Sequence, residues 1–110
     1  MIKRISLVWK RPELSDAEFR RLWLGEHVVY AKQLAGLREY VIDFVTEGPD
    51  KAPAGIATLC FDSRQALEAA FSDARLSREL LRTREQFARE VEVMLVDEQV
   101  VVSRATAEQP

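Results

Sequence analysis

Two hydrophobic periodicities alternate along this 110-residue chain. Alternation with a period of two predicts four strands, at residues 2–9, 37–46, 56–61 and 91–102. Helical spacing predicts a long helix from the capping box of Ser15 and Glu18 to the cap at Gly36, and two later helices, at residues 62–71 and 75–89. The order is β-α-β-β-α-β with one extra helix before the last strand, which is the split βαβ pattern. We therefore expect an α+β domain with a four-stranded antiparallel sheet and its helices on one face.

The second face of that sheet must also be covered. Both faces of the first and third predicted strands are largely apolar, as is typical of strands that are buried on both sides. A chain of 110 residues has the size of one domain, which we place at residues 1–103, followed by a C-terminal tail at 104–110. We therefore expect a second copy to pack against the sheet and form a homodimer.

Composition excludes several classes of function. The net charge of −2 gives no reason to expect nucleic acid or an anionic membrane as a partner, and the apolar runs are too short to span a bilayer. The single cysteine, Cys60, excludes an internal disulfide and fits a reducing cytoplasm, and the first residues lack the apolar core of a signal peptide. One histidine and one cysteine are too few for a zinc site, and no glycine-rich phosphate loop is present. We therefore expect a cytoplasmic protein without metal or cofactor.

Short motifs spread over nearly the whole domain resemble the EthD family. These motifs are residues 1–11, Leu14-Ser15, Glu18-Phe19, Trp23 with Glu26-His27, Gly36-Leu37-Arg38, Tyr40, Phe61-Asp62-Ser63, Ala66-Leu67 and residues 97–101. Their order and spacing are similar to those of the family. The resemblance implies the ferredoxin-like fold in its dimeric α/β-barrel form, which agrees with the predicted order of elements.

The resemblance also implies a cofactor-free barrel that handles a small, ring-shaped molecule with a carbonyl group. Relatives include methylmuconolactone methylisomerase, cofactor-independent anthrone oxygenases and fungal pigment dehydratases. In methylisomerase-like members, a histidine at the position of His27 and a tyrosine at that of Tyr40 line the pocket. The pocket cysteine of the isomerase falls on Leu59 here, and Cys60 lies one place later on the opposite strand face. This departure argues against the same reaction in this chain.

The two candidate catalytic residues are His27 and Tyr40. Imidazole titrates near neutral pH, so His27 can accept and return a proton, as isomerisation or dehydration beside a carbonyl requires. The phenol of Tyr40 can donate a hydrogen bond to an oxygen that becomes negative. Each residue also has a purely structural interpretation: a helix histidine bonded to a backbone carbonyl, and a core tyrosine whose hydroxyl is satisfied.

The candidate substrate-binding residues are Trp9, Glu26, Tyr30 and Phe44. The three aromatic residues would stack on a ring ligand, although aromatic residues at strand or helix spacing also serve as core. Glu26 lies in the apolar stripe of the long helix, where it would hold His27 or a backbone group, or act as a second acid. The alternative is that the helix frays at Gly25 and releases Glu26 to solvent.

These observations support three hypotheses about function. The first is a cofactor-independent isomerase or lyase that moves a proton on a small cyclic or aromatic carbonyl compound, such as a lactone, quinone or polyketide-like ring. The second is a non-catalytic protein that binds a small hydrophobic ligand. The third is an anthrone-type oxygenase in which the substrate supplies the electrons. We favour the first.

Overall fold

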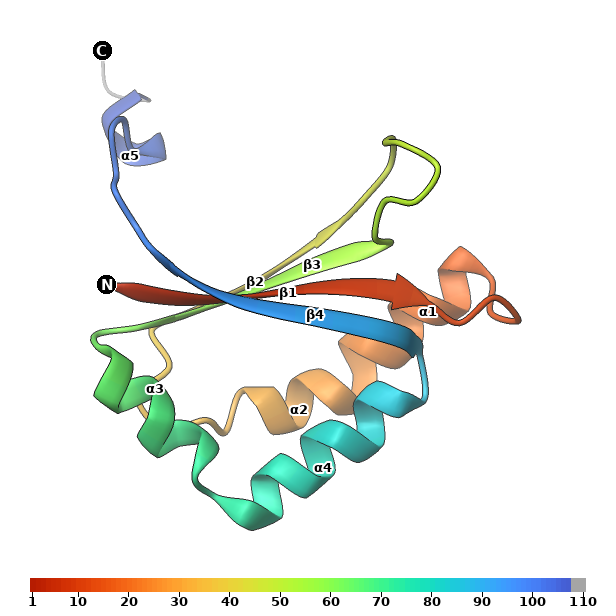
Figure 1. Ribbon diagram of the computed structural model, residues 1–110, viewed down its shortest axis with the longest axis horizontal. Coiled ribbons are helices and arrows are strands. Elements are labelled where there is room, and N and C mark those ends of the chain that lie inside the picture. Colours follow the sequence, from red (N-terminus) through yellow and green to blue (C-terminus); the bar gives the residue numbers. More distant parts are fainter. Residues whose placement is uncertain (108–110) are drawn as a thin grey trace.

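The computed structural model describes the backbone of residues 1–107 and the side chains of residues 1–105. Its strands are β1 (Ile2–Lys10), β2 (Glu39–Phe44), β3 (Gly55–Phe61) and β4 (Ala88–Asp97). Its helices are α1 (Asp16–Leu22), the π-helical turn η1 (Trp23–His27), α2 (Val28–Ala31), α3 (Arg64–Phe71), α4 (Ala74–Glu85) and α5 (Arg104–Ala107). Helices α2, α3 and α4 cover one face of the sheet and leave the other bare (Figure 1).

The four strands form one antiparallel sheet. Their order is β2-β3-β1-β4, with β1 paired to β3 and β4 and with β2 paired to β3. Two strand–helix–strand units therefore interlock, so that the first and last strands lie side by side. This is the ferredoxin-like α+β fold that the sequence predicts.

Alternation along each strand divides the side chains between the two faces of the sheet. In β1, Arg4, Ser6 and Val8 point toward the helices, where Ser6 and Val8 are buried. The opposite set leaves a surface without helices, which we call the open face. By strand register the apolar residues of the open face are Ile5, Leu7, Trp9, Val41, Ile56, Met94 and Val96.

The predicted long helix is interrupted at Gly25. Its N-terminus is capped as expected, because Ser15 accepts from the Glu18 amide and the two side chains form a capping box. The backbone of Gly25 then has ψ −108°, outside the helical range, within the π-helical turn η1. The prediction of one continuous helix was therefore wrong, because a glycine backbone lets the chain change direction there.

The last strand is shorter and starts earlier than predicted. It runs from Ala88 to Asp97, whereas the sequence predicts residues 91–102. Asp97 pairs with Ile2, the first residue of β1, so the valines that follow have no neighbouring strand to bond. Val100, Val101 and Val102 are 64%, 91% and 70% exposed, and the chain leaves the body of the domain there (Figure 1).

An aromatic cluster holds the helices to the sheet. The Trp23 and Phe87 rings stack with centroids 5.2 Å apart, and Phe19 contacts both edge-on. Gly55 of β3 makes room for this cluster, since a Cβ atom there would lie 2.4 Å from the Trp23 ring. Close contact between this strand and Trp23 therefore requires glycine at position 55.

Candidate functional site

A cavity of about 160 Å³ lies between the sheet and the helices. Its polar lining comes from four elements that are far apart in the sequence: Arg4 and Ser6 from β1, His27 from η1, Tyr40 from β2, and Ser77 and Arg84 from α4. The rest of the wall is apolar, with Trp23, Leu59, Phe71 and Phe87 among its residues. A small apolar cavity with a few convergent polar groups is the usual form of a ligand site.

The cavity lies beside an uncovered edge of the sheet. Val93 and Leu95 of β4 pair with Ser6 and Arg4, and they point to the helix side of the sheet. They are nevertheless 45% and 38% exposed, so the helices do not cover this part of β4. A ligand therefore has a route to Ser6 and Arg4 from the β4 side.

His27 is fixed by a hydrogen bond to α4. Its Nδ1 lies 2.6 Å from the hydroxyl oxygen of Thr83, a fully buried residue. The Thr83 hydroxyl donates to the backbone carbonyls of Glu79 at 2.8 Å and Leu80 at 3.2 Å. Because its single hydrogen is used in this way, we assign the hydroxyl as an acceptor from Nδ1–H. This tautomer leaves the lone pair on Nε2 free to accept a proton.

The surroundings keep the His27 ring neutral. Burial lowers the pKa of His27 from 6.5 to about 4, and the positive charges of Arg84 and Arg4 lower it further, against a backbone hydrogen bond with Leu80 that raises it. The Phe87 ring adds an apolar edge-on contact, with centroids 5.3 Å apart. At neutral pH the imidazole is therefore available as a base and not as an acid.

Tyr40 is oriented by Trp23. The indole Nε1 of Trp23 donates to the Tyr40 hydroxyl oxygen at 3.3 Å, so the hydroxyl hydrogen is left to bond elsewhere. Burial raises the pKa of Tyr40 above its ordinary value of 10, so the phenol stays protonated at neutral pH. The cavity wall therefore contains a neutral hydrogen-bond donor as well as a neutral base.

The structure does not bring the other four predicted residues into this cavity. Glu26 is exposed and forms an ion pair with Arg82 at 2.8 Å, as the alternative of a helix interrupted at Gly25 implies. Tyr30 lies beside the same arginine, whose guanidinium is 5.9 Å from its ring centroid. The remaining two are Trp9, which lies on the open face and donates to the Lys51 carbonyl at 3.0 Å, and Phe44, which packs edge-on against Phe19 and Trp23.

Sequence reasoning missed three polar residues of the cavity. Thr83 lies on the inner stripe of α4, but its contact with His27 joins positions 56 residues apart. Arg4 and Ser6 occupy the inward register of β1, and the Arg4 guanidinium donates to Ser6 at 3.2 Å. Two polar residues in the inward register of a central strand are the signal that pointed to a site.

Neither a metal site nor a membrane span is found in the described part of the chain. Within residues 1–107, no three His, Cys, Asp or Glu side chains are grouped so that they could hold a metal ion. No helix in the same range is both long and apolar enough to cross a bilayer. Cys60, predicted as a small buried residue, is 4% exposed and contacts the sulfur of Met1 at 3.8 Å.

Several solved structures share the fold at low sequence identity. An EthD-family protein from Bacillus halodurans superposes with a TM-score of 0.75 at 18% identity, covering 90% of this chain and 99% of that chain. A dimeric ferredoxin-like protein of unknown function from Thermobifida fusca gives a TM-score of 0.69 at 10% identity, over 86% and 88% of the two chains. SnoaB, a cofactor-independent oxygenase from Streptomyces nogalater solved as a mutant, gives 0.66 at 14% identity, over 93% and 97%.

The sequence comparisons identify the family. None of the curated proteins matches the chain. The family model described as the EthD domain matches residues 11–90, which span the elements from α1 to the start of β4 and include His27, Tyr40 and Thr83. The chain therefore belongs to the EthD family.

Proposed function

We propose that this protein is a cofactor-independent enzyme that removes a proton from a carbon atom next to the carbonyl group of a small ring compound. His27 is the general base and Tyr40 the hydrogen-bond donor to the carbonyl oxygen. The observation that carries the proposal is the 2.6 Å contact between His27 Nδ1 and Thr83 Oγ1 in the wall of a cavity that Tyr40 also lines. A base held in one tautomer beside an oriented donor is the arrangement that enolisation requires.

The proposed step balances within the protein and the substrate. Nε2 of His27 takes the proton, the electrons of the C–H bond form the enolate, and the Tyr40 hydroxyl stabilises the negative oxygen. The imidazolium then returns its proton, either to another carbon of the enolate or to a departing oxygen. The first outcome is an isomerisation and the second an elimination, so one pair of residues serves both reaction types.

The volume of the cavity favours a single ring as substrate. About 160 Å³ is close to the roughly 150 Å³ of an apolar protein cavity that holds one benzene molecule. A three-ring anthrone is much larger, which is why we favour proton transfer over anthrone oxygenation. The fold shared with SnoaB keeps oxygenation as the second candidate, since an oxygenase without cofactor also begins by deprotonating its substrate.

The test is proton exchange at carbon. Small lactones and cyclic ketones are incubated with the protein in D₂O, and loss of the α-proton signal is followed by NMR. We expect His27→Gln to lower the exchange rate by roughly 100-fold or more and Tyr40→Phe by roughly 10-fold to 100-fold. Glu26→Gln is the matched control, because this exposed neighbour of His27 lies outside the cavity.

Three results would contradict this function. Exchange that is unchanged in His27→Gln would remove His27 from the mechanism. Binding of a ring compound without any exchange would favour the ligand-binding alternative, and oxygen consumption with phenols would favour the oxygenase. Thr83→Val tests the positioning of His27: we expect it to shift the pH profile of exchange and not only its maximum rate.

We also propose that a second copy of the chain covers the open face. Its apolar residues include Val41, Met94 and Val96, which are 39%, 43% and 36% exposed in the single chain. Acidic residues on the same face, such as Asp43 and Glu92, lie toward its margins, as in an interface with an apolar centre and a polar rim. Neighbours with this fold are described as dimeric, which supports a homodimer.

A further inference from the structure

Two positive charges line the cavity and no negative charge does. Arg4 enters it from β1 and Arg84 from α4, whereas none of its lining residues is Asp or Glu. The two guanidinium groups are close enough that Arg84 lowers the pKa of Arg4, which burial also lowers. Both stay protonated at neutral pH because guanidinium is so strong a base.

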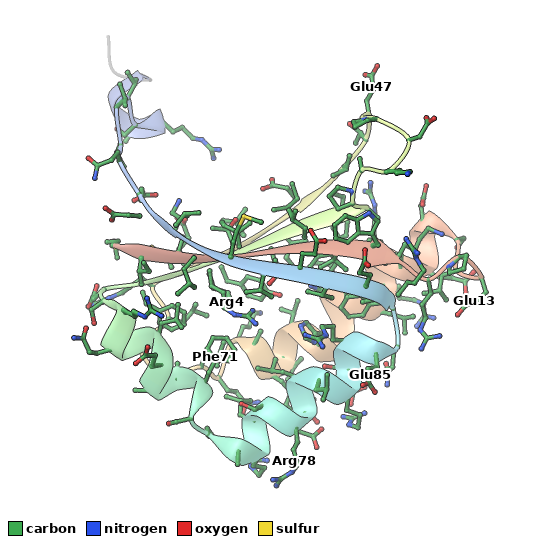
Figure 2. The ribbon with its side chains drawn as sticks, viewed as in Figure 1. Arg4, Glu13, Glu47, Phe71, Arg78 and Glu85 are labelled. Carbon is green, nitrogen blue, oxygen red and sulfur yellow. The ribbon has the colours of Figure 1, made fainter. Side chains whose placement is uncertain are left out.

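Most of the hydrogen-bond donors of these two arginines have no partner within the described residues. A guanidinium carries five N–H donors. Arg4 uses one for Ser6 at 3.2 Å, and its flat face lies 4.6 Å from the centroid of the Phe71 ring. Figure 2 shows Arg4 on the helix side of the sheet, above Phe71. The Arg84 side chain forms no hydrogen bond or ion pair to any residue in the range 1–105.

This lack of partners contrasts with the exposed surface of the same protein. Arg38 pairs with Asp62 at 2.8 Å, Arg64 with Glu68 at 3.1 Å, and Arg82 with both Glu26 and Glu79. The chain has 18 acidic residues against 16 basic ones, so carboxylates are not scarce. A buried charge without a partner is costly, far more than an exposed one. The two arginines of the cavity are therefore arranged for a negative charge that the chain itself does not supply.

We propose that the ligand of this cavity is an organic anion, a single ring bearing a carboxylate that binds between Arg4 and Arg84. This inference rests on the proposed function only in taking the same cavity as the ligand site, and it specifies the substrate class. The fork of a guanidinium matches the two oxygens of a carboxylate, and the apolar wall of Trp23, Leu59 and Phe87 suits the ring. The carboxylate orients the ring so that its reactive carbon faces His27.

The test compares an anion with a neutral molecule of nearly the same shape. Binding of benzoate and benzamide is measured by calorimetry at neutral pH and low ionic strength. We expect benzoate to bind at least roughly 10-fold more tightly than benzamide, because charge-assisted hydrogen bonds to two arginines form only with the carboxylate. Arg4→Met and Arg84→Met should each remove roughly 10-fold of benzoate affinity and leave benzamide binding unchanged.

The matched control is Arg78→Met. Arg78 is an exposed residue of α4 outside the cavity, so this variant removes the same charge from the same helix (Figure 2). We expect it to retain the preference for benzoate. Arg4→Lys, which keeps the charge but not the fork, should retain part of the preference, and the circular dichroism spectrum of each variant establishes that it is folded.

Failure of this inference can be told apart from failure of the proposed function. Equal binding of benzoate and benzamide, binding of neither, or a preference that survives in both Arg4→Met and Arg84→Met would overturn the anion site. An equal loss in Arg78→Met would overturn it too, because it would show an effect of total charge. His27→Gln should keep the preference for benzoate, so an inactive His27 mechanism leaves the anion site standing.

Discussion

The two faces of the sheet distribute polar and apolar side chains in opposite ways. The covered face holds a buried arginine and serine in its central strand, Arg4 and Ser6, beneath helices. The open face has no helices, yet its central strand carries Ile5, Leu7 and Trp9. Burial in a single chain therefore runs against the usual rule on both faces. Polar groups are buried where a ligand would bind, and apolar groups are exposed where a second copy would pack.

The largest expected effect comes from placing a charge on the open face. Met94 and Val93 are adjacent in β4 and are 43% and 45% exposed, but they point to opposite faces. Met94→Asp should weaken the dimer by at least about 3 kcal/mol, roughly 100-fold in Kd, because it buries an unpaired charge in the interface. Val93→Asp should leave the dimer intact. Sedimentation equilibrium of both variants measures this difference.

Two outcomes would end the comparison of faces in its present form. A wild-type chain that remains monomeric at concentrations of about 100 μM would remove the second copy from the open face. Equal weakening by the two substitutions would show that the effect of charge does not depend on the face that carries it.

The covered face should respond to pH through its single histidine. The pKa of His27 is lowered to about 4 in the folded chain, so on acidification the unfolded chain takes up the proton first. The stabilising contribution is therefore complete above pH 6.5 and is lost as the pH falls from 6.5 to 4, by about 3 kcal/mol in all. Urea denaturation of the wild type and of His27→Gln at several pH values isolates this contribution. Parallel curves for the two proteins would show that the ring is not kept neutral.

The smallest expected effect compares neighbouring cations of β1 on opposite faces. Lys3 forms an ion pair with Glu98, whereas Arg4 has no carboxylate partner in the described chain. Arg4→Met should stabilise the protein by about 1 kcal/mol, because it removes an uncompensated buried charge. Lys3→Met should destabilise it by up to about 1 kcal/mol. Thermal denaturation of both variants checks the opposite signs, and a loss of stability in Arg4→Met would contradict the argument.

The sequence predicts the fold well because periodicity reports burial. Strand alternation and the capping box at Ser15 place the main elements, and Gly36 ends the helical segment with φ +76°, as expected of a C-cap. The errors lie where tertiary pairing decides an end. The strand β4 stops at Asp97 because β1 begins at Ile2, and no property of the valines beyond Asp97 indicates this.

The candidate site was less predictable from the sequence for a physical reason. His27 and Tyr40 line one cavity, but so do Arg4 and Arg84, which look like ordinary surface cations in the sequence. The role of Thr83 depends on how α4 crosses η1, a contact that no local pattern encodes. Aromatic residues show the opposite difficulty. Phe44 has the alternation of a wall residue, and only the packing of Phe19 and Trp23 over it places it in the core.

The interruption at Gly25 gives this family member a means of adjustment that is separate from its core. Trp23 and Val28 on either side of it are packed, but a Cβ atom at position 25 would have no neighbour within 4 Å. Only the backbone angles of Gly25 set the path from the anchored indole of Trp23 to the imidazole of His27. Changes at this position therefore act on the aim of the base by fractions of an ångström while leaving every packed contact in place. Variation during evolution can retune the reaction here at little cost in stability, and directed evolution of new activity has a natural starting point at residue 25.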